Sequence, residues 1–304
     1  MLHSHVKQIY QATHHDSPDF LGFGIGLRPC HYEEILRSAP SIIDWFEIVT
    51  EDYLVDGGSH LYYLEAIRQS YPIVFHGVSL SIGSCDEINW TYLKTLKALA
   101  DRFQPPWISD HLCWTGVNGI NIHDLLPLPY TTECLKHVVV RVHQVQEFLK
   151  QPLVLENPSS YITYQQADYS EWEFLTALSE QTGCKILLDI NNIFVSGFNH
   201  SFDPLTYLEG IPRDLVKQFH LAGHKRCSDY IIDTHDDAVT DVVWELYRVA
   251  VERFGKIPVL IERDDKIPPL SELVMELERA KTIFQTVIQK KSIKLEEELL
   301  SQPS

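Results

Sequence analysis

Short runs of β-forming residues alternate with amphipathic segments along almost the whole chain. Eight runs are predicted to be strands, at 23–28, 44–49, 72–79, 107–114, 152–159, 185–192, 216–223 and 258–265. Apolar residues near i, i+3, i+4 and i+7 predict helices, at 31–39, 61–70, 92–103, 134–150, 171–183, 203–211, 242–255 and 271–291. Alternation of this kind predicts an α/β protein with a parallel sheet, and eight units favour a closed (β/α)8 TIM barrel. A doubly wound open sheet is the alternative.

The domain organisation follows from the length and from the absence of a linker. No stretch rich in Pro, Gly or Ser divides the 304 residues, so we expect one TIM-barrel domain. Within it we expect an N-terminal extension at 1–20, the barrel at 22–288 and a charged C-terminal tail at 289–304.

Composition excludes several classes of protein. A hydrophobic content of 44% supports a large core, yet the apolar runs are too short to span a membrane. The N-terminus lacks the pattern of a secretory signal. A net charge of −17 disfavours nucleic acid as a partner. The six cysteines form no C-x-x-C pair, which is typical of reduced thiols in a cytoplasmic protein.

Polar side chains occur at the carboxyl ends of most predicted strands. They are Arg28, Glu47, His76, Asp110, His111, Glu156, Asn157, Asp189, Asn191, Asn192, His220 and Glu262. In a barrel these ends open onto one face, where they converge. Taken singly, each carboxylate could cap a helix and each histidine could be a hydrogen-bonded core residue. As a set, three histidines and three carboxylates would be costly to bury unpaired, and such mixed ligands suit Zn, Fe or Mn.

The stretch YIIDTHDD, at 230–237, adds two more candidate ligands. In an extended segment Asp233 and His235 point the same way and could chelate one ion. Asp236 and Asp237 precede a helical run at Val239, so they could instead cap that helix. We expect ligands first and a cap behind them. In HDLLPLPY we expect a rigid loop from which Asp124 reaches the site.

Several common catalytic motifs are absent from the sequence. It contains no G-x-S-x-G, P-loop or H-E-x-x-H pattern, which argues against the usual serine hydrolases, P-loop NTPases and zincins. GFGIGLR lacks the third glycine of a dinucleotide-binding turn, so its glycines are expected to permit close packing in the barrel.

Taken in order, nine motifs resemble those of the multinuclear non-heme iron-dependent oxidases. They are GIGLRP, FHGVSLSIGS, SDHLCW, DLLPLPYT, LENPSSY, LLDINNI, HLAGH, IDTHD and LIERDD, and they run from about Gly22 to Ala280. The resemblance implies a xylose-isomerase-like TIM barrel with two or three iron ions, in mixed Fe(II)/Fe(III) states, and dioxygen as co-substrate. It also implies oxidative modification of cysteine residues in a ribosomally made precursor peptide. A small partner protein would present that peptide.

The metal layout is also similar to that of endonuclease IV, a related barrel. By that likeness His76 and His111 hold one ion, and Glu156 bridges it to a second. The remaining ligands of the second ion would be Asp189, His220 and Glu262. The third would be held by Asp233, His235 and Asn192. Residues assigned to orientation or proton transfer are Asp110, His224 and Asp264, and those assigned to substrate binding are Arg263 and Asn157.

The sequence departs from this family near the second strand. A histidine often follows the glutamate there, but Val49 and Thr50 stand in its place, which bears on substrate choice. Two other hypotheses about the function stay open. One is a divalent-metal sugar isomerase or phosphoester hydrolase, and the other is a partner-binding barrel with structural metal.

Overall fold

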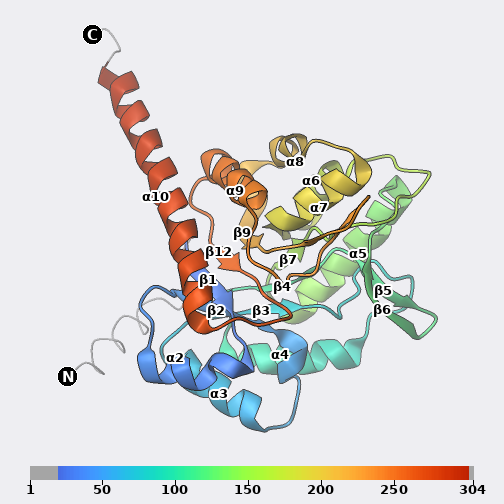
Figure 1. The fold of residues 1–304 in the computed structure, drawn as a ribbon. Helices are drawn as coiled ribbons and strands as arrows, with labels where there is room; N and C mark the ends of the chain where they lie inside the picture. The colour runs from blue at the N-terminus through green and yellow to red at the C-terminus, as the bar shows by residue number, and fades with distance from the viewer. Residues whose placement is uncertain (1–19, 301–304) are drawn as a thin grey trace.

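Eight parallel strands close into a barrel, which confirms the TIM-barrel prediction and excludes the open sheet (Figure 1). The computed structural model describes residues 20–300, with side chains up to residue 294. Around the barrel the strands are β1 (Phe23–Gly26), β12 (Val259–Ile261), β9 (Val216–Leu221), β8 (Lys185–Asp189), β7 (Leu153–Glu156), β4 (Ile108–His111), β3 (Ile73–Gly77) and β2 (Trp45–Val49). Most of the predicted extension at 1–20 lies outside the described residues.

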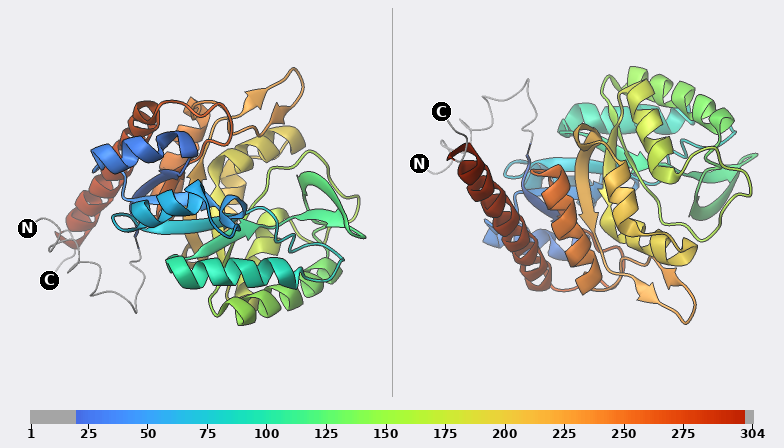
Figure 2. Two further views of the ribbon diagram at one scale, coloured as in Figure 1. Left: turned by 90° about the horizontal axis from the view of Figure 1, so that it is seen from below. Right: turned by 90° about the horizontal axis from the view of Figure 1, so that it is seen from above.

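The helices lie around the outside of the barrel, as the two views of Figure 2 show. They are α2 (Tyr32–Ser38), α3 (Ser59–Arg68), α4 (Trp90–Phe103), α5 (Thr132–Leu149), α6 (Glu171–Thr182), α7 (Ile190–His200), α8 (Pro204–Gly210), α9 (Asp241–Phe254) and α10 (Leu270–Leu300). Short 3-10 helices lie at Pro29–His31, Thr50–Tyr53 and Arg213–Leu215. Every predicted helix is present, and α7 is an addition.

Helix α7 corrects the predicted strand at 185–192. The strand ends at Asp189, whose carboxylate accepts a hydrogen bond from the backbone N–H of Asn192 at 2.6 Å. This is an N-cap, and it starts a helix within one residue of the strand. Asn191 and Asn192 therefore lie in the first turn of α7 and not at the end of a strand.

Two antiparallel hairpins extend the loops that follow β4 and β9. The first pairs β5 (Trp114–Val117) with β6 (Ile120–Leu126), where a rigid loop was predicted. The second pairs β10 (Lys225–Arg226) with β11 (Ile231–Ile232). The stretch at 230–237 thus begins as a short hairpin strand outside the barrel. The cap expected at Asp236 and Asp237 is not formed, because α9 begins at Asp241 and its N-cap residue is Thr240.

The barrel interior has an apolar floor. Inward-facing side chains from six segments form a separate buried cluster, made of Trp45, Val74, Trp107, Val154, Leu187 and Leu260. A Cβ on Gly24 would lie 2.5 Å from ring atoms of Trp45, so glycine lets this ring fill the floor. The larger core lies between the outer faces of the strands and the helices.

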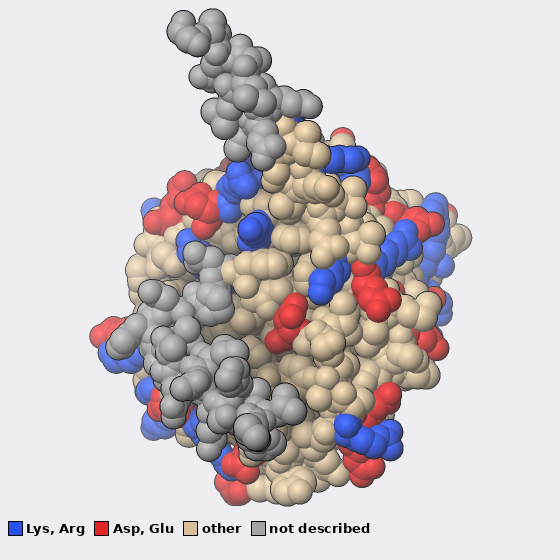
Figure 3. All heavy atoms as spheres, turned by 90° about the vertical axis from the view of Figure 1, so that its left-hand side faces the viewer, with Lys and Arg blue, Asp and Glu red and all other residues tan. Residues whose placement is uncertain are grey.

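Helix α10 projects well beyond the barrel at its C-terminal end (Figure 1). Where described residues are visible in Figure 3, Lys and Arg side chains lie interspersed with Asp and Glu side chains. Among the described residues, no helix is long and apolar enough to cross a membrane.

Candidate metal centre

A polar layer sits directly above the apolar floor of the barrel. Side chains alternate in direction along a strand, so residues two apart share a face. Two positions beyond the floor residues of β2, β3, β7, β8 and β12 come Glu47, His76, Glu156, Asp189 and Glu262. All five are buried. The same alternation that builds the floor therefore aims these polar groups into the barrel.

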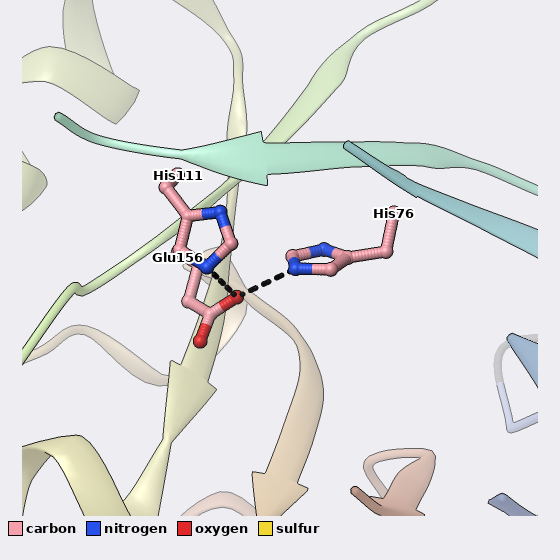
Figure 4. A group of neighbouring side chains, drawn as sticks. All are labelled: His76, His111 and Glu156. Carbon is pink, nitrogen blue, oxygen red and sulfur yellow. Dashed lines mark ion pairs between the residues drawn. The ribbon is translucent and has the colours of Figure 1, made fainter. Parts of the chain in front are cut away.

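The first group of potential ligands joins His76, His111 and Glu156. Nε2 of His76 lies 3.2 Å and Nε2 of His111 lies 3.4 Å from the same Glu156 oxygen, Oε2 (Figure 4). The Nδ1 atoms of both rings, which face away from Glu156, have hydrogen-bond partners of their own. Nδ1 of His76 is 2.9 Å from Ser109 Oγ, and Nδ1 of His111 is 3.2 Å from the Gly77 carbonyl oxygen. Both Nε2 atoms are thereby left for an ion.

The second group contains Glu156, Asp189, His220 and Glu262, with one ligand atom from each within 4.8 Å of the others. Nε2 of His220 is held by Glu47 at 2.9 Å. Nδ1 of His220 faces the cluster, 2.9 Å from Glu262 Oε2. Glu156 belongs to both groups, so one carboxylate links them.

A third group surrounds His235, which is buried and has a left-handed backbone with φ of 45°. Its Nε2 lies 2.7 Å from Asp233 Oδ1, and its Nδ1 lies 3.1 Å from Glu262 and 3.2 Å from Asp264. Its potential ligand set is therefore His235, Glu262 and Asp264, with Asp233 at the opposite nitrogen. Glu262 links this group to the second one.

Asn192, expected in the third group, lies between the groups. Its Nδ2 donates to Glu156 Oε1 at 3.3 Å and to the Asn157 carbonyl oxygen at 3.1 Å. Its Oδ1 is buried, has no hydrogen-bond partner and belongs to a residue that lines the pocket above the cluster.

Burial and mutual repulsion shift the proton affinities of these groups in opposing directions. Burial lowers the pKa of His111 to about 4, and it also lowers the pKa of His76 well below its usual range. Burial raises the pKa of Asp189 to about 7 and that of Glu156 well above its usual range. For Glu262 burial acts in the same sense, but His220 and His235 outweigh it and hold its pKa low. Cations would relieve the cost of so many buried carboxylates.

The unsatisfied atoms of the site fit a metal centre. Six buried polar atoms of the cluster make no hydrogen bond of regular geometry: Glu156 Oε2, Asp189 Oδ2, Asn192 Oδ1, His220 Nδ1, His235 Nε2 and Glu262 Oε2. Each belongs to a residue predicted as a ligand. All but Asn192 Oδ1 lie 2.7–3.7 Å from another side-chain atom of the cluster. Buried polar atoms that lack a regular hydrogen bond are costly, so their concentration here fits a site for ions.

The other predicted site residues support the cluster or lie apart from it. Asp110 is buried and accepts hydrogen bonds from the backbone N–H groups of His111 and Leu80. Nδ1 of His224 is 2.7 Å from Asn191 Oδ1, and Asn191 Nδ2 donates to Asp233 Oδ1 at 2.8 Å. His224 thus reaches the third group through one side chain.

The two predicted substrate contacts have other partners. Asn157 exchanges two hydrogen bonds with the backbone of Asp189, at 2.9 and 3.1 Å. Arg263 is buried and donates to Glu276 of α10 at 2.6 Å. Neither residue lines the pocket above the cluster.

Sequence reasoning missed two supporting residues, Gln218 and Ser109, and gave Arg28 no partner. Gln218 donates to Glu47 at 2.7 Å and accepts from Trp107 at 2.6 Å, so it fixes the carboxylate that holds His220. Gln218 and Ser109 each precede a histidine by two residues on a strand, and this spacing could have revealed them. Arg28 pairs with Asp264 and is the one Lys or Arg lining the pocket.

The pocket above the cluster has a volume of about 430 Å³. His76, His111, His235 and Glu262 form part of its wall. Residues of its rim include Val49, Asp52, Asp124 and Tyr161. The expected approach of Asp124 to the site is thus observed, and Val49 of the family departure faces the same pocket.

Solved structures with the same fold are xylose-isomerase-like barrels. A D-tagatose 3-epimerase-like protein matches with a TM-score of 0.58 and 16% identity, over 88% of this chain and 99% of that one. A putative xylose isomerase of Rhodospirillum rubrum matches with a TM-score of 0.55 and 9% identity, over 88% and 99% of the two chains. At these identities the likeness shows the fold alone.

Sequence relatives are much closer. A UPF0276 protein of Caulobacter vibrioides is 51% identical over 86% of this chain and 94% of its own. A UPF0276 protein of Anaeromyxobacter is 49% identical over 86% and 92% of the two chains. The family model described as "RiPP precursor modification enzyme MbnB/TglH/ChrH" matches residues 22–285. The chain therefore belongs to this family of enzymes, which modify ribosomally made precursor peptides.

Proposed function

We propose that the protein is a multinuclear iron- and dioxygen-dependent enzyme that oxidatively modifies cysteine residues of its precursor peptide. The observation that carries this proposal is the run of three ligand groups. Glu156 joins the first group to the second, and Asp189 of the second group lies 3.7 Å from His235 Nε2, the ring nitrogen that faces Asp233. A row of linked sites suits a cluster better than a single ion.

In this proposal His76, His111 and Glu156 would hold the first ion. Asp189, His220 and Glu262 would hold the next, together with Glu156. His235 would hold a third with Asp233 and Asn192, and Asp264 lies at the opposite ring nitrogen of His235. Iron of mixed Fe(II)/Fe(III) state would supply electrons for dioxygen reduction and lower the pKa of a substrate thiol.

The residues of the chain itself orient the ligands. Ser109, Gly77 and Glu47 each hold the outer nitrogen of one histidine, which fixes the ring and its tautomer. Asp264 does the same for His235 and is itself paired with Arg28 at the pocket rim. A substrate carboxylate that bound Arg28 would compete with Asp264, so Arg28 links the rim to the third group.

Other parts of the proposal rest on the family alone. They are a cysteine-containing peptide as substrate, a small protein that presents it, and a cytoplasmic setting. The sugar isomerase or phosphoester hydrolase alternative uses the same ligands. It differs in its prediction, because such an enzyme would turn over its substrate without dioxygen.

The test is metal analysis of anaerobically purified protein, with iron quantified and characterised by Mössbauer spectroscopy. We expect at least two irons per chain, and dioxygen consumption that depends on a cysteine-containing peptide. Full activity with zinc as the only metal would contradict the proposal.

The third group is tested separately. Asp233→Ala and His235→Ala should each lose one metal equivalent and keep the fold and the remaining metal. His143→Ala, at an exposed histidine on α5, serves as the control and should lose none. If the two site variants lost all the metal, or none, the assignment of this group would be wrong.

A further inference from the structure

A second pocket opens beside the hairpin β5–β6, on the opposite side of the barrel from α9. This pocket, called the apolar pocket below, has a volume of about 440 Å³. Trp114, Val117, Leu128, Pro129 and Tyr164 form much of its wall. The loop 83–85 and the first turns of α5 complete it. Glu133 is the one carboxylate, and no Lys or Arg is present, among its lining residues.

Two segments of the chain line both the apolar pocket and the pocket above the metal centre, which is called the metal pocket below. The hairpin gives Trp114, Gly116 and Val117 to the first and Asp124 and Leu125 to the second. The segment after β7 gives Tyr164 to the first and Tyr161 to the second. The two pockets are thus neighbours along one loop.

Hydrogen bonds fix both ends of this connecting segment. The Tyr161 hydroxyl accepts from the backbone N–H of Asp233 at 2.9 Å, beside the third ligand group. The Tyr164 hydroxyl donates to the Pro127 carbonyl oxygen at 3.0 Å, and Trp114 Nε1 donates to the same oxygen at 3.1 Å. The segment is therefore tied to the hairpin at one end and to the metal pocket at the other.

The segment between the pockets is exposed and apolar. The exposed fractions are 44% for Tyr161, 47% for Ile162 and 36% for Tyr164. A group of exposed large apolar residues beside a pocket is typical of an interaction surface. Three Cα–Cα steps separate the two tyrosines, so their Cα atoms lie at most about 11 Å apart.

We propose that the apolar pocket binds an apolar side chain of the precursor peptide, three to five residues from the residue modified at the metal centre. The inference rests on the proposed function and specifies its substrate. An extended peptide covers about 3.3–3.6 Å per residue. About three residues therefore span the segment from Tyr161 to Tyr164, and up to two more reach into the pockets on either side. The volume suits an aromatic or large aliphatic side chain, and the lack of cationic lining residues disfavours an acidic one.

The probes are fluorescein-labelled Gly/Ser peptides with one Cys and one Trp, separated by one to eight residues in either order. Fluorescence anisotropy measures their affinity for metal-loaded protein without dioxygen. We expect one order to bind best at a separation of three to five residues, at least tenfold more tightly than a peptide without Trp.

Val117→Asp should weaken that best peptide at least tenfold and leave the Trp-free peptide unchanged. Val242→Asp is the matched control. Val242 lies on α9, lines neither pocket, and has an exposed fraction of 40%, against 37% for Val117. It should change neither affinity. Cys85→Trp, which fills the pocket from its other wall, should reproduce the loss and guards against misfolding of the first variant.

The inference would be overturned if the affinity did not depend on the position of Trp in the peptide. It would also be overturned if neither Val117→Asp nor Cys85→Trp lowered the affinity. It would also be overturned if these variants affected only the binding of a small protein encoded beside the gene. Replacement of Cys by Ser in the best peptide separates the two proposals. Retained dependence on Trp position with no dependence on Cys would support the apolar pocket and contradict the cysteine chemistry.

Discussion

Glu47 is the buried residue that fixes His220 without belonging to any ligand group. Its two oxygens lie 2.9 Å from His220 Nε2 and 2.7 Å from Gln218 Nε2. A carboxylate behind a metal-binding histidine orients the ring and strengthens it as a ligand. Glu47→Gln should therefore lower the affinity for the second ion about 10–100-fold, with the ligands themselves intact.

Competition with a graded series of chelators measures this loss. Glu34→Gln, at an exposed position on α2, is the control and should match the unmodified protein. Equal affinities for all three proteins would show that the Glu47 contact is only structural.

Glu171, at the start of α6, is a residue whose proton couples to stability. Burial raises its pKa from 4.5 to about 7, although it accepts a hydrogen bond from Tyr207 at 2.9 Å. Between these values the folded state keeps a proton that the unfolded state releases, so stability falls as pH rises from about 4.5 to 7. Above pH 7 the full penalty applies, about 3 kcal/mol at most, reduced by the N-terminus of the helix.

Glu171→Gln should remove this penalty. Urea unfolding should show the variant as the more stable protein at pH 8, with the difference fading towards pH 4.5. The metal centre is common to both proteins and cancels in the comparison. A difference that did not change with pH would rule out this ionisation as its cause.

At the scale of elements, the barrel could be predicted because both periodicities are strong. The strands carry apolar runs and the helices carry amphipathic faces, so element type and order follow from local pattern. The convergence of polar side chains at the ends of β3, β4, β7, β9 and β12 followed as well, since strand ends meet on one face.

The missed helix α7 begins at a residue that has three roles. Asp189 ends β8, caps α7 and faces the cluster, so the polar run after it looked like more strand. The two hairpins were missed because three of their four strands have four residues or fewer, and few of their side chains are buried. His235 takes a left-handed backbone that no pattern in the sequence announces, and the neighbours of its ring could not be foreseen.

The first strand offers a test of packing inside the barrel. Gly24→Ala would place a methyl group 2.5 Å from the ring of Trp45, which is fully buried and has no room to move. Overpacking of this kind costs about 1–3 kcal/mol, so the free energy of unfolding should fall by that amount.

Gly57→Ala is the matched control, because its new methyl group would meet nothing within 4 Å. It should stay within about 0.5 kcal/mol of the unmodified protein in denaturant unfolding. Equal effects of the two substitutions would mean that the floor of the barrel can rearrange.

On the scale of the whole molecule, closure of the barrel is what makes the site. The predicted ligands run from His76 to Glu262 in sequence, yet atoms from β7, β8, β9 and the residue after β12 lie within 4.8 Å of one another in the second group. No local segment could assemble this group alone. The third group depends in addition on Asp233 and His235, which lie in a loop outside the barrel. We therefore expect substitutions in that loop to weaken metal binding at the third group while the barrel stays folded.

The boundary proposed at residue 288 can be tested on the last helix. Phe284 stacks on Phe20, with ring centroids 5.0 Å apart, and meets Phe23 edge to face. Val287 is the last buried side chain among the described residues of α10, and beyond it the helix projects from the barrel (Figure 1).

A chain ending at residue 288 should therefore unfold within about 1 kcal/mol of the full chain, with only exposed contacts removed. A chain ending at residue 280 loses Phe284 and Val287. Because removal of one buried phenylalanine side chain costs about 3–5 kcal/mol, it should be destabilised by at least that much. Urea unfolding measures the free energy of unfolding of the full chain and of the two shortened chains. A large loss already at residue 288 would place the tail within the folding unit, since the projecting part of α10 would then contribute to the stability of the barrel.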